Sequence, residues 1–425
     1  MFKLIATSLG AKIITAVSSL LIVIIGSHYL GAKNMGDISL IVLAITIFIQ
    51  INNIVGGGAL VYLLPRHNTT SLLVLSYLWA IVTIFISTIV IVVLHLVDSI
   101  YIWHTVILAS LFVFSNIHWM VFLAKERINL YNILQATNIL LLLTGFSIFI
   151  FVFHENSVFS YIKALYIAYG LSFFLSSAFL LKHIRFQRPN NISASISELF
   201  RFGSIMQTAN ILQLFNYRFL YYLIEQMLGK TLLGIYSVGN QVSEGVWLMS
   251  NSASTVLYPK ISNSTDQNHA LRITLSFTKG IGIITLFIIL VLWLLPATFY
   301  GWVFSQEFTS VKPIILSLSG GIFFLSLSKI LSNYFSGIGK PQVNTVASGI
   351  GAVVLASLGY FFISRWHLIG AGLIASLTYF SGFCYQFIQL KKHNNLTIMD
   401  FKLTSADKDF FRKEFKQFFK KSNHQ

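Results

Sequence analysis

The ten residues LGAKNMGDIS at positions 30–39 resemble a second segment, LGKTLLGIYS at positions 228–237. Both segments begin with Leu-Gly, and both place a second glycine and a serine at the same spacing, at Gly36 and Ser39 and at Gly234 and Ser237. Each copy lies between two long apolar stretches. Identical spacing in two copies about half a chain apart indicates an internal duplication.

The composition indicates a membrane protein. Hydrophobic residues make up 56% of the 425 residues and charged residues only 10%, which is more apolar surface than a soluble protein buries. Apolar stretches of about 20 residues, long enough to cross a bilayer as helices, recur along the whole chain. We therefore predict an all-α integral membrane protein with about twelve transmembrane helices in two six-helix bundles. The spans are expected to start near Gly10, Ile38, Leu72, Ile102, Asn132, Phe159, Gly203, Leu233, Gly280, Pro313, Val343 and Ile369.

These spans predict the domain organisation. We expect one bundle over residues 1–181, a cytoplasmic linker over 182–202, a second bundle over 203–391 and a basic amphipathic tail over 392–425. The first apolar stretch is too long for a signal peptide and is expected to be a helix. A membrane protein built from two similar halves is typical of transporters, in which the substrate site lies between the halves. Six spans per half predict that the halves run the same way, related by an axis along the membrane normal.

The distribution of charge predicts the topology. The formal net charge of +16 would suit a nucleic-acid binder, but the basic residues lie on alternate loops, which is the positive-inside pattern and places both termini in the cytoplasm. The predicted inner side carries Lys3, Arg66, Lys125, Arg127, Lys182, Arg185, Arg188, Arg201, Lys260, Arg272, Lys279, Lys340 and the tail. The outer side carries Lys33, Lys163, Lys230, Lys312 and Arg365. We expect no nucleic-acid partner.

The tail has the pattern of a helix that lies on a membrane surface. Its aromatic residues fall on one broad helical face, with lysines opposite, which favours contact with an anionic leaflet. A short solvated tail is the alternative. The aromatic face consists of Phe410, Phe411, Phe415, Phe418 and Phe419.

Several chemistries find no support in the sequence. Cys384 is the single cysteine, the histidines lack the spacing of zinc ligands, and we expect neither a metal nor a cofactor. We expect His118, in the fourth span, to be a hydrogen-bonded residue of the bundle. Residues 337–340 resemble a phosphate-binding loop, but the glycine spacing is wrong and Pro341 replaces the required Ser/Thr. The outer acidic residues, which a membrane-embedded sugar transferase would need in pairs, are scattered as Asp37, Asp98, Glu155, Glu225 and Glu307. The sequence therefore favours a protein that is not an enzyme.

Polar residues inside the spans are costly and mark candidate sites. On the seventh span the helical period of 3.6 places a polar set on one face. This set consists of Gln207, Asn210, Arg218, Tyr221 and Glu225. The eighth span has a matching face with Ser237, Asn240, Glu244, Trp247 and Asn251.

Two interpretations of Arg218 remain open at this stage. It forms a structural ion pair with Glu244 on the neighbouring span, or it faces a water-filled cavity where its forked donors bind an anion. Glu244 is the candidate for ion coupling. Lys12 and Lys329 either snorkel to the inner surface or line the same cavity. If the three cations converge, they make a basic vestibule between the halves.

Several motifs resemble those of a known family. They include Arg218-Phe219-Leu220 through Leu228-Gly229, then residues 234–238, Glu244 with Trp247, Tyr258-Pro259, Tyr29-Leu30-Gly31 with Gly36, and residues 369–372. Together they are similar to the polysaccharide flippases of the O-antigen type. These belong to the multidrug/oligosaccharidyl-lipid/polysaccharide exporter (MOP) superfamily, which also holds multidrug and toxin extruders and lipid II flippases.

The resemblance implies two six-helix bundles in a V and the transfer of an undecaprenyl-pyrophosphate-linked oligosaccharide, of O-antigen or capsule type, across the bacterial inner membrane by alternating access. It implies that Arg218 contacts the pyrophosphate or an acidic sugar. Two positions depart from the family: Leu220 replaces a common Asp, and His28-Tyr29 replaces a common Arg. The first departure leaves Glu244 as the coupling candidate.

The expected substrate-binding residues are Arg218, Lys12, Lys329, Gln207, Asn210, Asn240 and Asn251. The expected partners are the lipid-linked oligosaccharide and anionic lipids at the tail, with glycan polymerase machinery as a further candidate. We expect a monomer, since the architecture closes its own core. The alternatives are a multidrug or cation extruder of the same superfamily, a membrane-embedded glycan-assembly enzyme and a passive scaffold protein. An extruder of cations should have an acidic cavity, and a scaffold leaves the polar faces unexplained.

Overall fold

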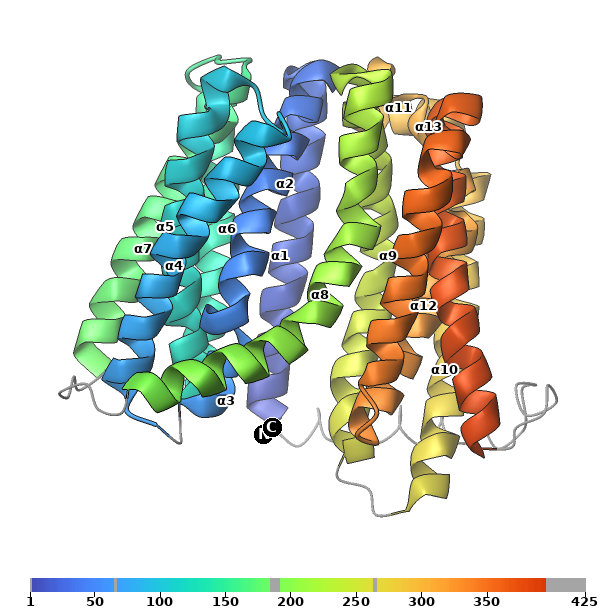
Figure 1. Ribbon diagram of the computed structural model, residues 1–425. Coiled ribbons are helices and arrows are strands. Elements are labelled where there is room, and N and C mark those ends of the chain that lie inside the picture. The colour runs from blue at the N-terminus through green and yellow to red at the C-terminus, as the bar shows by residue number, and fades with distance from the viewer. Residues whose placement is uncertain (1, 65–66, 184–191, 263–265, 395–425) are drawn as a thin grey trace. The chain divides into compact units, whose positions relative to one another are not determined.

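The computed structural model describes residues 2–64, 67–183, 192–262 and 266–394, and every regular element in those ranges is a helix (Figure 1). The first six predicted spans correspond to α1 (Phe2–Tyr29), α2 (Gly31–Gly56), α4 (Thr69–Val93), α5 (Ser99–Ala124), α6 (Ile128–Phe151) and α7 (Val158–His183). The later ones correspond to α8 (Ile192–Leu228), α9 (Lys230–Ser262), α10 (Gln267–Leu294), α12 (Val311–Gly337) and α13 (Gln342–Asn394). The short elements are α3 (Gly58–Leu63), α11 (Ala297–Phe304) and η1 (Gln306–Phe308).

The last long helix accounts for two spans. Helix α13 contains 53 residues and has a non-helical residue inside, His367, with φ 51° and ψ −128°. An unbroken helix of that length would measure about 80 Å, far more than the ~30 Å hydrocarbon core of a bilayer. The break therefore separates an eleventh from a twelfth span, close to the predicted start at Ile369. All twelve predicted starts fall in separate helical segments, and the all-α prediction is confirmed.

Nine helices within the described ranges are long and apolar enough to cross a membrane. They are α1 from Gly10 onward, α2 with α3, α4, α5, α6, α7, α10, α12 and α13. The chain is thus a multi-pass integral membrane protein. Which side of the membrane holds the termini stays a prediction, and the predicted amphipathic tail after Asn394 lies outside the described residues.

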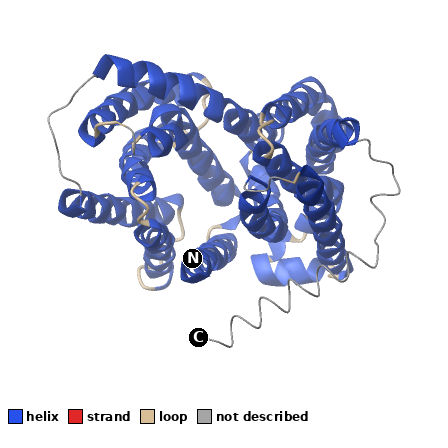
Figure 2. Ribbon diagram, turned by 90° about the horizontal axis from the view of Figure 1, so that it is seen from below, coloured by secondary structure: helices blue, strands red, loops and turns tan. Residues whose placement is uncertain are grey.

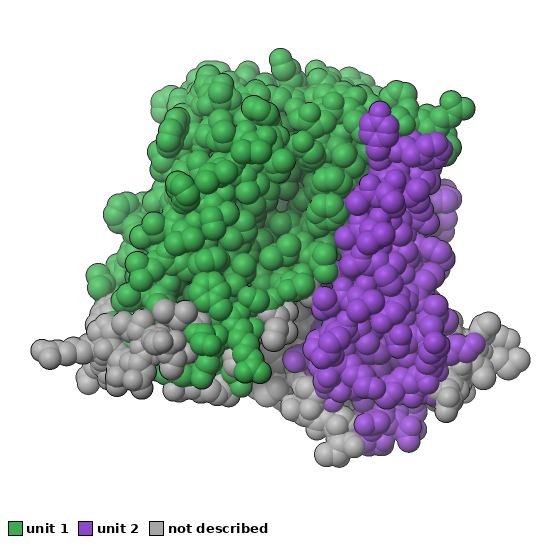
Figure 3. Space-filling view, viewed as in Figure 1, with its two compact units in different colours: residues 1–242, 296–314, 363–371 green, residues 243–295, 315–362, 372–425 purple. Residues whose placement is uncertain are grey.

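The described residues form two compact units, shown in different colours in Figure 3. The first unit contains residues 1–242, 296–314 and 363–371, and the second contains 243–295, 315–362 and 372–425. The predicted boundaries of the two bundles and the linker stay a prediction. Helix α8 begins at Ile192, inside the segment predicted as a linker.

The first unit is built around α2, which packs against α4, α5 and α8, while α1 packs on α6 and α6 on α7. Helix α8 is bent, and its first turns cross the ends of α3 and α4 (Figure 1). A glycine permits its close contact with α2, because a Cβ atom on Gly203 would lie 1.6 Å from the carbonyl oxygen of Ile54. The end-on view in Figure 2 shows the described elements as helices joined by short loops.

His118 lies inside the first unit and is hydrogen-bonded, as predicted. Its Nε2 lies 2.8 Å from the Tyr77 hydroxyl and its Nδ1 lies 2.9 Å from the Ser176 hydroxyl. These bonds tie α5 to α4 and α7. A buried polar side chain in a membrane bundle needs such partners, and both ring nitrogens of His118 have one.

The second unit has its own apolar core where α9, α10, α12 and α13 meet. That core contains Leu257, Ile273, Ile330, Tyr334, Phe335 and Leu390, all buried. Small residues bring α12 and α13 together: the Ser376 hydroxyl donates to the carbonyl oxygen of Ser317 at 2.7 Å and accepts from the Gly321 N–H at 3.0 Å. Side-chain hydrogen bonds between small residues are a usual means of joining membrane helices.

Candidate functional site

The two copies of the duplicated segment adopt the same turn. Helix α1 ends at Tyr29 and α8 ends at Leu228, and in each case the chain reverses through a glycine in the left-handed region, Gly31 at φ 76° and Gly229 at φ 84°. Glycine adopts this conformation without the steric cost that a Cβ atom imposes. The repeated Leu-Gly is therefore a repeated turn: α2 begins at its glycine, Gly31, and α9 begins at Lys230, directly after Gly229.

The second glycine of each copy packs against the main chain of the other copy. A Cβ atom on Gly36 would lie 2.1 Å from the carbonyl oxygen of Lys230, and a Cβ atom on Gly234 would lie 1.8 Å from that of Ala32. The duplication relates Gly36 to Gly234 and Ala32 to Lys230, so the two contacts are equivalent. Helices α2 and α9 thus meet through a reciprocal glycine contact in the first unit.

Charged groups surround this contact. The Lys230 Nζ lies 2.7 Å from Asp37 Oδ1 and also binds the carboxylate of Asp98. The Ala32 N–H, at the start of α2, donates to Glu307 Oε2 at 2.7 Å. These acidic residues are scattered in the sequence, but in the fold Asp37 and Asp98 bind the same lysine. Glu307 lies at the N-terminus of α2, where a negative charge is favourable.

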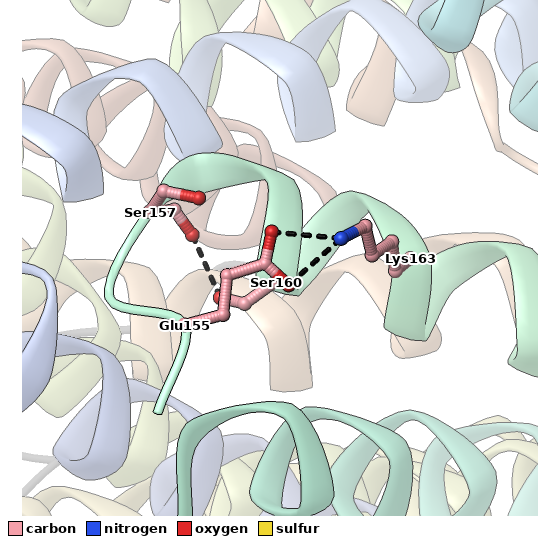
Figure 4. Close-up of polar contacts among 4 residues, drawn as sticks. All are labelled: Glu155, Ser157, Ser160 and Lys163. Atoms are coloured by element: carbon pink, nitrogen blue, oxygen red, sulfur yellow. Dashed lines mark hydrogen bonds and ion pairs between the residues drawn. The ribbon is translucent and has the colours of Figure 1, made fainter. Parts of the chain in front are cut away.

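A second ion pair on the predicted outer side, between Lys163 and Glu155, is more exposed than the pair between Lys230 and Asp37. Lys163 Nζ lies 2.8 and 2.9 Å from the two carboxylate oxygens of Glu155, next to the bond from the Ser160 hydroxyl to the Ser157 carbonyl oxygen (Figure 4). The Lys163 side chain is 50% exposed, whereas those of Lys230 and Asp37 are 19% and 8% exposed. Glu155 lies in the loop between α6 and α7 and Lys163 lies in α7, so this pair is local in the chain and joins neither copy of the duplicated segment.

A pocket of about 200 Å³ lies in the first unit among α1, α2, α6, α8 and α9. Arg218 is the cationic side chain among its lining residues, and Tyr221, Ser39, Ser237 and Gln241 are polar neighbours. Much of the remaining wall is apolar, with Ile22, Ile38, Val42, Leu142 and Phe146. Arg218 therefore lines a pocket of the first unit, and the binding of an anion there stays a prediction.

Tyr221 fixes the position of the Arg218 guanidinium. Arg218 Nη1 donates to the Tyr221 hydroxyl at 2.9 Å, and the guanidinium carbon lies 5.0 Å from the centroid of the same ring. Asn240 of α9 donates to that hydroxyl at 3.1 Å. An arginine held by a hydrogen bond and a cation–π contact loses less side-chain entropy when it binds an anion. The predicted residues Arg218 and Asn240 thus meet at Tyr221, which sequence reasoning placed on the polar face but gave no role.

Two further predicted residues belong to another contact. Gln207, which is buried, donates from Nε2 to the backbone oxygen of Gln50 at 3.0 Å and binds the Gln50 side chain as well. Asn210 donates to Gln207 Oε1 at 3.1 Å. Neither residue lines the Arg218 pocket. They join α8 to α2, one helical turn or more closer to the N-terminus of α8 than Arg218.

Lys329, Asn251 and Glu244 come together in the second unit. The Lys329 Nζ donates to Asn251 Oδ1 at 2.9 Å and lies 4.7 Å from the centroid of the Trp247 indole ring. Glu244 lies close enough to interact electrostatically with Lys329. Lys329 is therefore held among residues of the predicted polar face of α9. The ion pair between Glu244 and Arg218 stays a prediction, because the two residues belong to different units.

Lys12 is exposed on α1 and does not line the Arg218 pocket. Both interpretations of Lys12, snorkelling and cavity lining, stay predictions. The predicted convergence of Lys12, Arg218 and Lys329 on one vestibule stays a prediction.

Comparison with known proteins agrees with the membrane fold. A family model described as lipid II flippase MurJ matches residues 241–410. An uncharacterized membrane protein of Methanocaldococcus jannaschii is 27% identical over 145 residues, a stretch that spans 33% of this chain and 28% of the length of that protein.

Solved structures match over nearly the whole chain. A structure of the lipid II flippase MurJ in an inward closed conformation superposes with a TM-score of 0.75 at 14% identity, covering 92% of this chain and 88% of that one. An inward-facing multidrug resistance MATE family transporter of the MOP superfamily gives a TM-score of 0.69 at 14% identity, covering 90% and 96%. The Vibrio cholerae MATE transporter VcmN gives 0.61 at 15% identity, covering 94% and 98%. The chain therefore has the fold of the MOP-superfamily flippases and transporters.

Proposed function

We propose that this protein is a flippase that moves an undecaprenyl-pyrophosphate-linked oligosaccharide, of O-antigen or capsule type, across the inner membrane by alternating access. The observation that carries this proposal is Arg218, a cation inside a membrane bundle that lines a pocket and is held in place by Tyr221 and Asn240. A partly buried guanidinium with forked donors is suited to a pyrophosphate. The match to a lipid II flippase family model supports a lipid-linked substrate.

The other polar residues have assigned roles in this proposal. Arg218, Lys12, Lys329, Gln207, Asn210, Asn240 and Asn251 bind the head group along its path, and Glu244 is the coupling residue. The electrostatic interaction of Glu244 with Lys329 supports this role of Glu244. The tail binds anionic lipids, and glycan polymerase machinery receives the product. No enzymatic step is expected, because the proposed task is to translocate the substrate without changing it.

The first test is deletion of the gene, followed by electrophoresis of surface glycan and extraction of lipid-linked oligosaccharides. Loss of surface polymer with complete units trapped on the inner leaflet is the expected result. Normal surface glycan would contradict the proposal and favour a multidrug extruder of the same fold. Loss of polymer with incomplete units would contradict it in favour of a glycan-assembly enzyme.

The second test replaces Arg218 in purified protein reconstituted into vesicles. Arg218→Ala should lower the transport rate by about 10- to 100-fold, because a hydrogen bond to a charged group contributes about 1.5–3 kcal/mol. Arg218→Lys keeps the charge but loses the fork, so it should retain part of the activity. Arg365→Ala is the matched control, since Arg365 is exposed at the predicted outer side. Equal transport rates of Arg218→Ala and Arg365→Ala would contradict the assignment of Arg218 as a substrate-binding residue.

A further inference from the structure

The segment between α10 and α12 binds the turn between α1 and α2. We call residues 296–310, which contain α11 and η1, the outer strap. The Ser305 hydroxyl donates to the backbone oxygen of Ser27, in the last turn of α1, at 3.1 Å. Glu307 Oε2 accepts the Ala32 N–H, at the start of α2, at 2.7 Å. The outer strap therefore supplies a partner to one end of each helix, where backbone groups lack partners within the helix.

The outer strap is a folded element of its own. Its aromatic residues Tyr300, Phe304 and Phe308 are buried. A Cβ atom on Gly301 would lie 2.8 Å from Thr309 Cγ2, so α11 packs closely on the residues that follow η1. We therefore expect the outer strap to move as one body.

The outer strap packs in one unit and continues covalently into the other. Residues 296–314 belong to the first unit, whereas α10 up to Leu295 and α12 from Ile315 belong to the second. Helix α10 ends at Leu294, just before Pro296, because a proline does not continue a helix. Any movement of α10 or α12 therefore acts on the outer strap through the chain itself.

Two features favour release of the outer strap from the turn. Ser305 has φ 79° and ψ 162°, a backbone conformation that is essentially confined to glycine and costs free energy in other residues. Glu307 is exposed, and together with Lys33 and Thr231 it lines a pocket of about 440 Å³. Binding the turn thus keeps Ser305 strained, and release of Glu307 leaves its charge in contact with water.

The turn lies at one end of the Arg218 pocket. Gly26 of α1 and Met35 of α2 both line that pocket. Gly26 directly precedes Ser27, and Met35 lies one helical turn after Ala32. A Cβ atom on Gly26 would lie 2.7 Å from Met35 Sδ, so the two helices are in contact there. Keeping the ends of α1 and α2 together therefore closes the pocket at this end.

We propose that the outer strap is a latch for the Arg218 pocket. While Ser305 and Glu307 bind the turn, the ends of α1 and α2 stay together and the pocket is closed on the predicted outer side. The pocket opens to that side when the outer strap leaves the turn. The latch concerns access to the pocket, so it does not depend on which substrate the pocket takes.

The test measures how fast single cysteines of the full-length protein react with a membrane-impermeant maleimide. All variants carry Cys384→Ser, which removes the natural thiol. The reagent is added to the face of membrane vesicles on which Lys33→Cys reacts, since Lys33 is exposed beside the outer strap. Ser27→Cys reports on the end of α1, where Ser27 is buried, and Ser39→Cys reports on the pocket that Ser39 lines.

The matched control reporter is Ser160→Cys. Ser160 is as completely buried as Ser27, both being 0% exposed, and lies at the start of α7, where its hydroxyl donates to the Ser157 carbonyl oxygen (Figure 4). Its reaction rate detects unfolding of the first unit, because neither Ser160 nor Ser157 bonds to the outer strap.

Releasing the outer strap should speed the first two reporters and leave the control unchanged. Glu307→Ala should raise the reaction rates of Ser27→Cys and Ser39→Cys at least about tenfold, because a hydrogen bond to a charged group is lost. Glu155→Ala removes a carboxylate from the loop between α6 and α7 and should change neither rate. Ser305→Ala should raise both rates more than Ser305→Gly, since both remove the hydroxyl but glycine relieves the strain of the bound position.

Three results would overturn the latch. If Glu307→Ala speeds Ser27→Cys alone, the outer strap stabilises the turn without controlling the pocket. If Glu307→Ala changes neither reporter, the outer strap does not close the ends of α1 and α2. If Ser160→Cys also reacts faster, Glu307→Ala has unfolded the unit and the Ser305 variants decide: equal rates of Ser39→Cys in Ser305→Ala and Ser305→Gly would overturn the proposal, and a faster rate in Ser305→Ala would support it.

Discussion

The two duplicated turns, at Gly31 and at Gly229, are alike in their main chain and different in their charges. Both turn through a glycine with positive φ, and both place a second glycine against a carbonyl oxygen of the other copy. At the first turn a carboxylate, Glu307, accepts the Ala32 N–H at the start of α2. At the second turn a cation, Lys230, reaches back to Asp37 and Asp98.

This difference in charge shows that the main-chain contact, and not the charged contacts, depends on the two copies being alike. The main-chain contact needs both copies to keep a glycine, since a side chain on either one meets a carbonyl oxygen. The charged contacts need no such match, and Lys230 uses two carboxylates with no equivalent arrangement around Ala32 in the described residues. Sterically the contact is symmetric, while its electrostatics are one-sided.

Breaking the steric symmetry should have the largest effect. Gly36→Ala and Gly234→Ala each place a methyl group far inside contact distance of a main-chain oxygen, which costs about 1–3 kcal/mol or more of stability because backbone has to shift. The two losses should be similar, since the contacts are equivalent. Thermal unfolding of the detergent-purified variants measures both.

The matched control for these glycines is Gly170→Ala. Gly170 lies in α7 with open space around it, so this change should be neutral or stabilising by up to about 1 kcal/mol through the better helix propensity of alanine. If Gly36→Ala unfolds at the same temperature as Gly170→Ala, the close contact does not exist. If only one of Gly36→Ala and Gly234→Ala is destabilised, the contact is not symmetric.

Removing the one-sided charge should have the next largest effect. Lys230→Met leaves the buried carboxylate of Asp37 without its cation, at a cost of about 2–3 kcal/mol, between the values for exposed and for fully buried pairs. Adding Asp37→Asn should recover part of that loss. Asp98→Asn alone should cost less than Asp37→Asn, because the Asp98 side chain is 50% exposed. A double-mutant cycle on the unfolding temperature gives the coupling.

The exposed pair in Figure 4 provides the control for this cycle. Lys163→Met removes the same chemical group from a salt bridge with Glu155 on the predicted outer side. Surface pairs contribute about 0–1 kcal/mol, so this variant should unfold close to the wild type. A loss as large as that of Lys230→Met would mean that burial does not distinguish the two lysines.

The smallest expected effect separates the two turn glycines. Gly31→Ala and Gly229→Ala both force an alanine into the left-handed region, at about 1–2 kcal/mol each. A Cβ on Gly31 also lies 3.3 Å from Glu307 Oε2, whereas one on Gly229 meets open space. Gly31→Ala should therefore cost a few tenths of a kcal/mol more. In a Glu307→Ala background that excess should vanish, and its persistence would show that Glu307 is not the cause.

Much of the fold could be predicted from the sequence, because apolar stretches of bilayer length and glycine turns are local patterns. The spacing alone indicated that the segments around Gly31 and Gly229 are duplicated, and the structure shows that both copies turn through a glycine with positive φ. The short helices α3 and α11 contain only 6 and 8 residues. Such a length covers about two helical turns, which is too few for a periodic apolar pattern to be recognised. The cluster at Lys230 combines residues 37, 98 and 230, and no local pattern links positions so far apart.

For the candidate site, the helical period predicted which residues lie close together on one helix, but it did not predict which residues of different helices meet. It placed Arg218 and Tyr221 on one face, and the two side chains are in contact. It also paired Gln207 with Asn210, which are bonded. The bond from Asn240 to Tyr221 depends on the relative depth of α8 and α9, and the pocket wall from α1 and α6 depends on tertiary packing. Neither is encoded in the period of one helix.

The reciprocal glycine contact has the form of an isologous dimer interface inside a single chain. In such an interface one surface patch meets an identical patch, so a half-length chain carrying one copy of the turn would associate with a second half-length chain through it. Within one chain the two patches need not be identical, and here their charges differ, as those of a heterodimer interface do. Co-expressed halves with the native Lys230 and Asp37 on opposite chains would therefore prefer each other over their own copies.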